Sequence, residues 1–554
     1  MSGFYLSKAL FPPRTRGQIA QLRLYLLFKV QLRKIKTMIR KASAFIVIFI
    51  ISLVTAYSQE DIDLILTQKY AENSFRDGDY EFALENFLKL YDVDKNNIDI
   101  NYKIGICYTE TTIDKAKGIP YLEFVVSHNN FSDRTFYYLG RAYMYNYRFT
   151  EAVEAFYEYK MMGISEDIIN QTDRLIQMCY NAFEFINVPK NVTFELLDTS
   201  INSKFDDYLP MVSTDGNMLV YTSNRTYIAE YEDYIANLFY SENKKGSYQH
   251  GQRLPVSTFD NEQSVGMNPT GEKILIYANG DYSTHDIKMV NRKGSKYTNA
   301  AKNEIPSDMN TPGVEMGACL SPDGNTIYYA SDRRGGRGGL DIYISKKDVN
   351  GVWSPSQNIG STINTEYDEN YPSLSPDGKR LYFASRGHKG IGEYDIFRTS
   401  YIDSLQSWIP PFNLGVPINT PLDNTTISFT ADGKTAYLAA NRKEGIGKLD
   451  IYKVTFGDEN QAVTIIGTVM IGTEANSVPY SEDFLKAYAT LFDNFGNIIS
   501  QLEVLSEGGF FYGALFPGTY RLEVKFDGKT EGYVETLKIT AEEKEVYRTI
   551  YLKQ

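Results

Sequence analysis

The sequence predicts a multidomain α + all-β protein, in which an α-helical solenoid is followed by a five-bladed β-propeller and a small β-sandwich. Three observations support this: helical patterns with a repeat of 34–35 residues, five copies of a unit of roughly 54 residues, and a short all-β pattern after Gly457. The predicted ranges are 1–58 for an N-terminal extension with a signal peptide, 59–187 for the helical domain, 191–457 for the propeller and 463–554 for the sandwich.

The N-terminal segment has the pattern of an export signal. Its first 41 residues hold ten Lys and Arg, and the first carboxylate of the chain is Glu60. Ala42–Val54 is an apolar run of thirteen residues, too short to span a membrane. We therefore predict that translation starts at Met38, that cleavage follows Ser58, and that the protein is periplasmic, with association to the outer membrane as an open alternative.

The charge and the metal-binding residue types exclude several ligands. Removing the signal segment leaves 47 of the 57 basic residues against 69 acidic ones, a net charge of −22. Such a chain disfavours nucleic acid and anionic lipid as ligands. The three cysteines and four histidines show no spacing typical of a disulfide framework or a metal site. We predict no metal and no cofactor.

The helical region repeats small residues at fixed spacing. Ala71, Gly105 and Gly140 lie 34 and 35 residues apart, each inside a helical pattern. Small residues let paired helices approach each other, which is the tetratricopeptide pattern. Solenoids of this kind bind peptides or partner proteins, and the alternative is a structural spacer.

Five tight turns set the phase of the propeller repeats, and they lie 55, 53, 54 and 55 residues apart. Alternating apolar stretches on both sides of each turn predict antiparallel strands, four to each blade. The turns are Asp215-Gly216, Thr270-Gly271, Asp323-Gly324, Asp377-Gly378 and Asp432-Gly433.

The fifth blade lacks its own outermost strand. No strand pattern directly follows Asp450–Thr455, whereas an alternating segment, Val192–Leu197, precedes the first blade. We predict that this segment completes the fifth blade and so closes the ring without an unpaired edge.

Beyond the propeller, about seven short strands predict an immunoglobulin-like or transthyretin-like sandwich. No chemistry is visible in this region.

Charged residues recur at two positions of the propeller repeat. Acids stand eight residues before the turn, at the start of the innermost strand, and arginines stand ten residues after it, one place early in blade four. The start of the innermost strand and the end of the next strand lie on the same face of the propeller. We therefore expect the acids and arginines to form a ring around the mouth of its central channel. Its predicted members are Asp207, Glu262, Glu315, Glu369, Arg225, Arg333, Arg386 and Arg442.

We interpret this ring as structural, built of charge-assisted pairs. The alternative is a docking face or a cation site. Catalysis needs unlike carboxylates in unlike environments, and the symmetry of the ring argues against it. We therefore predict no catalytic residue here.

One loop of blade one is rich in tyrosine. Tyr227, Tyr231 and Tyr234 form a candidate partner loop on the same face, suited to protein or sugar contact. A solvated loop is the alternative.

Several motifs also carry a family resemblance. They include Leu320-Ser321-Pro322-Asp323-Gly324, Gly338–Tyr343, Asn413-Leu414-Gly415 and Pro517–Tyr520. With these motifs the chain resembles periplasmic proteins of Bacteroidota that join tetratricopeptide repeats, a TolB-like (WD-like) propeller and a carboxypeptidase-regulatory-like domain. A related type, the PorE-type component of type IX secretion, carries an OmpA-like domain that grips peptidoglycan. This chain shows no such domain, so we do not expect peptidoglycan binding.

The resemblance implies a non-catalytic periplasmic scaffold or adaptor in a cell-envelope assembly, linked to type IX secretion or outer-membrane organisation. Its partners would be envelope proteins, held by the helical repeats and the propeller face, and we predict that it is not an enzyme.

The alternative function is glycan binding or glycoside hydrolysis, because five-bladed rings also house glycosidases with carboxylates over the central channel. Blade two, with Asp281 and His285, would then be the place for it. Carboxylates left unpaired in an open cleft about 5 to 10 Å across would favour this alternative.

Overall fold

The computed structural model describes residues 27–29, 31–32, 34–36, 38 and 59–553 with short gaps. The gaps are at 113, 129–131, 163–164, 188, 230–232, 257–260, 281–282, 403–406, 458–462, 482, 506–508, 516, 541–542 and 544. The predicted signal segment after Met38 and the loop residue Tyr231 lie outside the described residues. The chain divides into two compact units, Met1–Cys107 and Tyr108–Gln554.

The first unit contains a packed pair of helices, α2 (Gln59–Asp77) and α3 (Tyr80–Val93). Asp79 caps α3, since its carboxylate accepts a hydrogen bond from the backbone N–H of Phe82 at 3.2 Å. Phe87 is fully buried, and its ring lies 5.9 Å from that of Phe75. The buried apolar face therefore joins the two helices. α4 (Ile98–Glu110) contains the boundary between the units.

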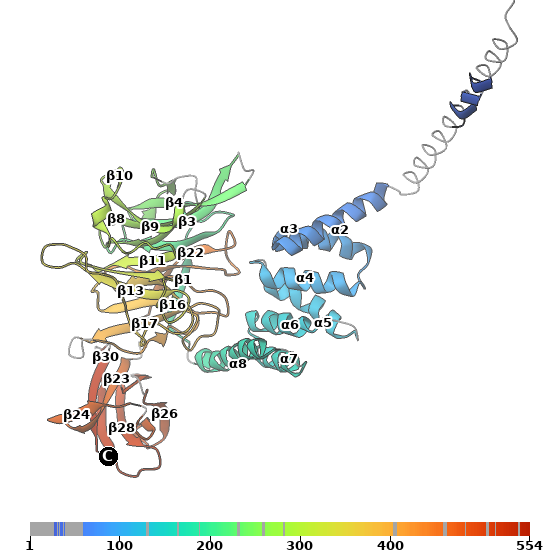
Figure 1. Ribbon diagram of the computed structural model, residues 1–554. Coiled ribbons are helices and arrows are strands. Elements are labelled where there is room, and N and C mark those ends of the chain that lie inside the picture. The colour runs from blue at the N-terminus through green and yellow to red at the C-terminus, as the bar shows by residue number, and fades with distance from the viewer. Residues whose placement is uncertain are drawn as a thin grey trace, which may run out of the picture. The chain divides into compact units, whose positions relative to one another are not determined.

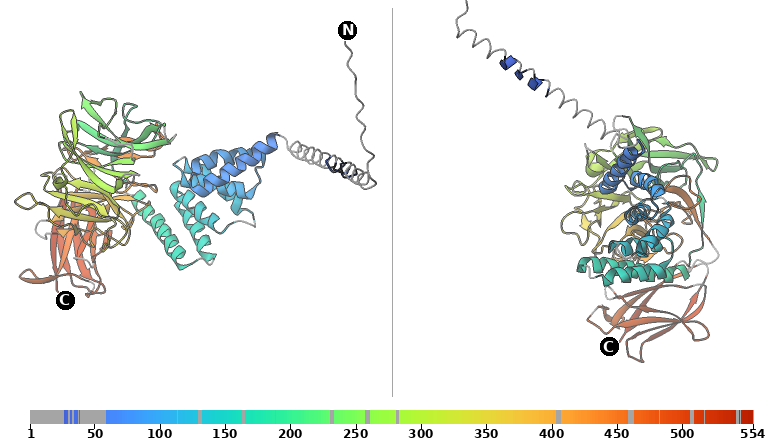
Figure 2. Two further views of the ribbon diagram at one scale, coloured as in Figure 1. Left: turned by 45° about the horizontal axis from the view of Figure 1, so that its top comes forward. Right: turned by 90° about the vertical axis from the view of Figure 1, so that its right-hand side faces the viewer.

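The helices of the second unit pack through small residues. Gly140 lies against Phe156, and a Cβ at this position would stand 2.5 Å from the ring. Figures 1 and 2 show the helices of residues 59–187 as blue to teal coils. In the parts of the chain that the structure describes, no helix combines the length and apolar character of a membrane span. These helices are η1 (Lys115–Gly118), α5 (Ile119–Val126), α6 (Arg134–Tyr145), α7 (Phe149–Met161) and α8 (Glu166–Asn187).

The predicted fold class, α + all-β with a tetratricopeptide solenoid, is wrong. The described residues are mostly β and form seven sheets. The helical region is not one compact unit, because the division falls inside α4. In the expected middle repeat a 3₁₀ turn leads into α5, only eight residues long, with Pro120 in its first turn. The repeat pattern specifies how neighbouring helices pack, and it does not require the pairs to stack.

Five of the sheets form a β-propeller-like ring of antiparallel strands, drawn green to orange in Figure 1. The sheets are joined by buried clusters, such as the one that shares Leu275 and Leu320 between the second and third. In chain order the strands are β2 (Asp207–Val212), β3 (Met218–Ile228), β4 (Asp233–Lys244), β5 (Ser247–Tyr248) and β6 (Gln252–Arg253); β7 (Asn261–Met267), β8 (Lys273–Gly280), β9 (Ser283–Lys293) and β10 (Lys296–Asn299); β11 (Glu315–Leu320), β12 (Thr326–Ser331), β13 (Asp341–Lys346) and β14 (Gln357–Asn358), preceded by η2 (Lys302–Glu304); β15 (Glu369–Leu374), β16 (Arg380–Ser385), β17 (Asp395–Ile402), β18 (Ser407–Trp408) and β19 (Phe412–Asn413); and β20 (Ser428–Phe429), β21 (Thr435–Ala440) and β22 (Asp450–Phe456).

The predicted turns have the geometry that their residues favour. The five turn glycines have φ between 63° and 71°, a region that glycine enters without steric cost. In the third blade, Asp323 accepts hydrogen bonds from the Ser321 hydroxyl at 2.5 Å and from the backbone N–H of Asn325 at 3.0 Å. The turn is therefore fixed by its own side chains.

The predicted closure of the ring is confirmed. β1 (Val192–Leu196) pairs antiparallel with β22, from Val192 opposite Phe456 to Leu196 opposite Tyr452. Asn202 strengthens the joint, because its side chain donates to the carbonyl of Ile451 at 3.0 Å and accepts from its N–H at 2.8 Å. An N-terminal strand thus covers the edge of the last sheet.

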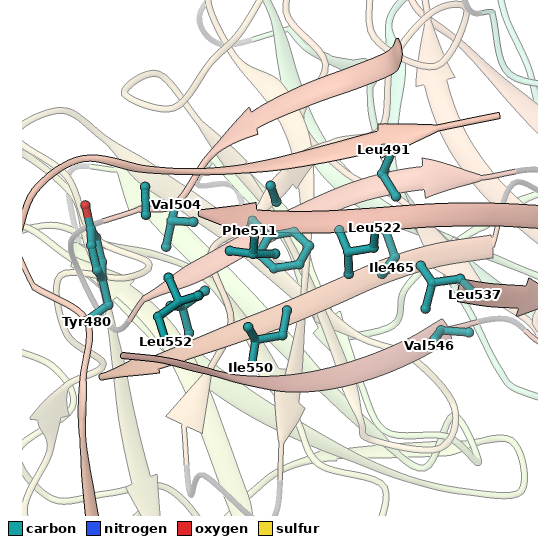
Figure 3. Close-up of a cluster of buried hydrophobic side chains, with 14 of the residues drawn as sticks. Ile465, Tyr480, Leu491, Val504, Phe511, Leu522, Leu537, Val546, Ile550 and Leu552 are labelled. Carbon is teal, nitrogen blue, oxygen red and sulfur yellow. The ribbon is translucent and has the colours of Figure 1, made fainter. Parts of the chain in front are cut away.

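The last two sheets face each other around an apolar core (Figure 3). Phe511, Leu522 and Ile550 are almost fully buried in it. β30 pairs parallel with β23, so the last described strand is hydrogen-bonded to this sheet. The strands are β23 (Val463–Thr473), β24 (Asn476–Pro479), β27 (Phe510–Leu515) and β30 (Glu545–Leu552) in one layer, and β25 (Ala487–Phe492), β26 (Ile498–Glu503), β28 (Gly518–Phe526) and β29 (Tyr533–Ile539) in the other.

Candidate functional site

The predicted acid–arginine ring is present in blades one and three. Arg225 pairs with the buried Asp207, and Arg333 lies 3.8 Å from the buried Glu315 between Nη2 and Oε1. Both arginines also donate to a backbone carbonyl at 2.6 Å, that of Ile201 in blade one and that of Met309 in blade three. In these two blades the charges are therefore satisfied within the blade.

Blade four departs from this arrangement. Glu369 is fully buried and accepts from the N–H of Thr365 and the hydroxyl of Ser385, both at 2.7 Å. Arg386 lies elsewhere, with Nη1 3.7 Å from Oδ2 of Asp368. His388 takes the arginine's place, since its Nε2 lies 2.8 Å from the carbonyl oxygen of Ile363 and therefore donates to it.

Burial shifts the pKa values of Glu369 and His388. It raises the pKa of Glu369 to about 7, although the hydrogen bonds from Thr365 and Ser385 oppose the rise. It lowers the pKa of His388 to about 4, so this imidazole is neutral at pH 7. A neutral histidine thus contacts the backbone carbonyl of Ile363, whereas in blades one and three an arginine contacts the carbonyl at the corresponding place.

The other predicted ring members have different surroundings. Glu262 is buried at the start of β7. Asn424, at the acid position of blade five, accepts from the N–H of Thr420 at 2.7 Å. Arg442 is turned toward Glu444, 3.1 Å away, and its guanidinium lies 4.0 Å from the ring centroid of Phe194.

Two tyrosines of the candidate partner loop are exposed. Tyr227 on β3 and Tyr234 on β4 have 52% and 45% of their surface accessible, and their ring centroids are 5.1 Å apart. Tyr234 also contacts Phe205, with the centroids 4.6 Å apart. The pair forms a small exposed aromatic surface.

A cavity of about 870 Å³ in the second unit lies beside the loops of the β-propeller-like ring. This volume is within the range of ligand sites. The helical segments from the end of α4 to α6 supply one part of the wall, and the starts of β2 and β15 with the loops around β21 supply the other. The lining residues used below are Glu110, Lys115, Arg141, Tyr145, Tyr147, Tyr208, Tyr371, Arg386, Glu393, Asp423, Arg442, Lys443 and Glu444.

Backbone irregularities bring two tyrosines into the wall. The register of β2 against β3 shifts after Tyr208, and that of β15 against β16 shifts after Asn370. Leu209 and Tyr371 have φ of 50° and 49°, values that non-glycine residues adopt at a cost. Bulges of this kind redirect side chains beside functional sites.

Tyr145 completes the aromatic wall together with Tyr147. The hydroxyl of Tyr145 accepts two hydrogen bonds from Arg141, at 2.7 and 3.1 Å. Burial raises the pKa of Tyr145 and that of Tyr208 to about 12, so both phenols keep their protons. The wall therefore offers neutral aromatic faces with polar ends.

Two carboxylates in the cavity have unlike environments. Asp423 accepts a hydrogen bond from the N–H of Tyr394 at 3.1 Å. Its pKa is raised, first because the surrounding protein desolvates it and second because Glu393 is near. Glu393 has a cation beside it, with Arg386 Nη2 4.0 Å from its Oε2. A carboxyl group with a raised pKa beside a second carboxyl group suits acid–base chemistry.

Sequence reasoning missed both carboxylates. Asp423 directly precedes Asn424, the residue at the acid position of blade five, and belongs to a second repeated feature. Asp206 and Asp368 likewise accept a hydrogen bond from the backbone N–H of the residue just before a third strand of a blade, β22 and β13 respectively. Glu393 has a clearer signal, because the equivalent positions hold Gly339 and Lys448. A search for departures from the repeat would have found it.

Comparison with known proteins gave only distant structural likenesses. No family model matches the chain, and no curated protein matches it. A solved structure described as a glycoside hydrolase aligns with a TM-score of 0.36 at 10% identity, over 50% of this chain and 95% of the other. Fructan 1-exohydrolase IIa from Cichorium intybus gives 0.31 at 9% identity, over 66% and 99%. The α-L-arabinanase of Penicillium chrysogenum gives 0.29 at 11% identity, over 48% and 98%.

These results correct two predictions. The three neighbours are named as carbohydrate-cleaving enzymes, so the predicted non-catalytic scaffold function and the prediction that the protein is not an enzyme are wrong. At TM-scores this low, the likenesses say nothing about which residues act or on what. Those assignments come from the cavity itself.

Proposed function

We propose that the protein acts on carbohydrates, binding a glycan in the 870 Å³ cavity and hydrolysing a glycosidic bond there. The observation that supports this is the combination of a tyrosine-lined cavity with the unlike carboxylates Asp423 and Glu393. Sugar rings stack on aromatic faces, and glycoside hydrolysis uses a pair of carboxyl groups.

The two carboxyl groups take different roles in this reaction. Asp423, whose pKa is raised, is the general acid and gives its proton to the glycosidic oxygen as the bond to the anomeric carbon breaks. Glu393, with Arg386 Nη2 4.0 Å from its Oε2, is the general base and accepts the proton of the water that attacks the anomeric carbon. The products are two sugars with free hydroxyl groups, and the two carboxyl groups have exchanged protonation states.

The experiment is a hydrolysis screen of the purified protein against α- and β-linked aryl glycosides and oligosaccharides, with calorimetric binding to the same sugars. We expect Asp423→Asn and Glu393→Gln each to lower kcat by roughly 10²- to 10⁴-fold, because each removes one proton-transfer group. Glu474→Gln, on the exposed turn between β23 and β24, is the control and should keep wild-type activity. If the wild-type protein neither binds nor cleaves any glycan, the proposal is wrong.

We also propose that the protein is exported to the periplasm and that it is related to periplasmic proteins of Bacteroidota. The apolar run Ala42–Val54 after Arg40 and Lys41 supports export. N-terminal sequencing of the periplasmic fraction should find Gln59 first. Contact with envelope proteins through the helices or through Tyr227 and Tyr234 can be tested by crosslinking in intact cells.

A further inference from the structure

The charges that line the cavity are not balanced. Three carboxylates are held by arginines: Glu110 by Arg141 at 2.5 Å, Glu444 by Arg442 at 3.1 Å and Glu393 by Arg386 at 4.0 Å. Among the described lining residues, Lys115 and Lys443 are the cations outside any ion pair, and Asp423 is the carboxyl group outside one. If Asp423 carries a proton as the general acid, the cavity has an excess of positive charge.

Lys115 is the cation in the more enclosed position. Its ammonium donates to the carbonyl of Thr109 at 2.5 Å and lies 4.7 Å from the ring centroid of Tyr145. An ammonium has three N–H donors, so this contact leaves two for a ligand. Burial and the nearby Arg141 lower the pKa of Lys115 to about 8, although Glu110, Asp423 and Glu393 oppose this shift.

We propose that the glycan bound in this cavity is acidic, and that Lys115 contacts its negatively charged group. This inference rests on the proposed function and names its substrate class. An anion beside Lys115 offsets both the desolvation of the ammonium and the repulsion from Arg141. The ring of Tyr145 lies beneath the Lys115 ammonium and holds it in the cavity wall through a cation–π contact.

The test uses oligosaccharides that differ in charge alone. Calorimetry compares an oligogalacturonide with the same oligomer after full methyl esterification, which removes the charge and keeps the sugar. A sulfated oligosaccharide and its desulfated form serve as a second pair and distinguish a sulfate from a carboxylate. We expect the charged member of at least one pair to bind 10-fold or more tightly, and Lys115→Gln to reduce this preference to below 3-fold.

Two variants make the result specific. Lys115→Arg keeps a cation and should keep most of the preference, whereas Lys117→Gln, on the exposed side of the same 3₁₀ turn, should leave it unchanged. Binding of charged and neutral members with equal affinity would overturn the acidic-glycan inference and leave the proposed function standing. Absence of binding by every glycan would remove both.

Discussion

The charged ring and the cavity are built in contrasting ways. In the ring, blades one, three and four each bury a carboxylate that is satisfied by donors of its own blade, such as Thr365 and Ser385 around Glu369. In the cavity, the side chains come from helices, strand bulges and loops, and Asp423 is left outside any ion pair.

This difference separates buried polar groups that stabilise the fold from polar groups that are available to a ligand. A buried group whose hydrogen bonds are satisfied locally stabilises one conformation and has nothing left with which to bind a ligand. Asp423 has a raised pKa and lies outside any ion pair in the cavity wall, which leaves its carboxyl group available for proton transfer. Asp423 occupies a position that the repeat shares with Asp206 and Asp368, whereas Glu393 departs from the repeat, whose equivalent positions hold Gly339 and Lys448.

The largest expected effect is the loss of the strand that closes the ring. Replacing Val192–Leu197 by a Gly-Ser segment of equal length leaves β22 with an unpaired edge and exposes Phe194 and its neighbours. We expect the free energy of unfolding to fall by on the order of 3 kcal/mol or more, measured by urea denaturation. The double variant Thr193→Ser and Glu195→Gln changes the outward side chains of the same strand and is the control. Equal stability of the Gly-Ser variant and the wild type would show that β1 does not close the ring.

The closure also shows what sequence can establish about this fold. The turns, the strand order and the borrowed strand follow from local chemistry, because Asp-Gly turns and period-2 patterns are satisfied over a few residues. The helical solenoid was wrongly predicted because stacking depends on contacts between pairs, which Gly105 and its repeat partners do not encode. The cavity was missed for a similar reason: Glu393 and Asp423 meet Arg386 only after folding.

Glu369 tests the ring through its pH dependence. Its pKa is raised from 4.5 to about 7 in the folded protein, so it is protonated in both states below about pH 4.5. Between pH 4.5 and 7 the unfolded chain ionises while the folded protein does not, and stability falls as the pH rises. The wild type should therefore lose about 3 kcal/mol relative to Glu369→Gln across this window, measured by urea denaturation at several pH values.

The substitution Glu474→Gln, which removes an exposed carboxyl group, should leave the pH profile of stability parallel to that of the wild type. If the stability difference between the wild type and Glu369→Gln stays constant from pH 4.5 to 7, then Glu369 titrates normally. The ring would then be open to solvent and would lose its contrast with the cavity.

The smallest expected effect on stability is at Arg386, which the repeat assigned to the ring and the structure places in the cavity wall. Its ion pairs with Asp368 and Glu393 are 3.7 and 4.0 Å long and partly exposed. Arg386→Gln should therefore lower the free energy of unfolding by less than about 1 kcal/mol. It should still lower glycan hydrolysis, because Glu393 loses the guanidinium that lies beside it in the cavity wall.

Arg333→Gln is the matched ring variant, and it should behave in the opposite way. It leaves the fully buried Glu315 without its arginine, and we expect a loss of about 1 to 3 kcal/mol with unchanged hydrolysis per folded molecule. Urea denaturation and hydrolysis assays of both variants separate the two roles. If Arg386→Gln lost stability as Arg333→Gln does and kept full hydrolysis, Arg386 would belong to the ring after all, and Glu393 would not need a cation to act.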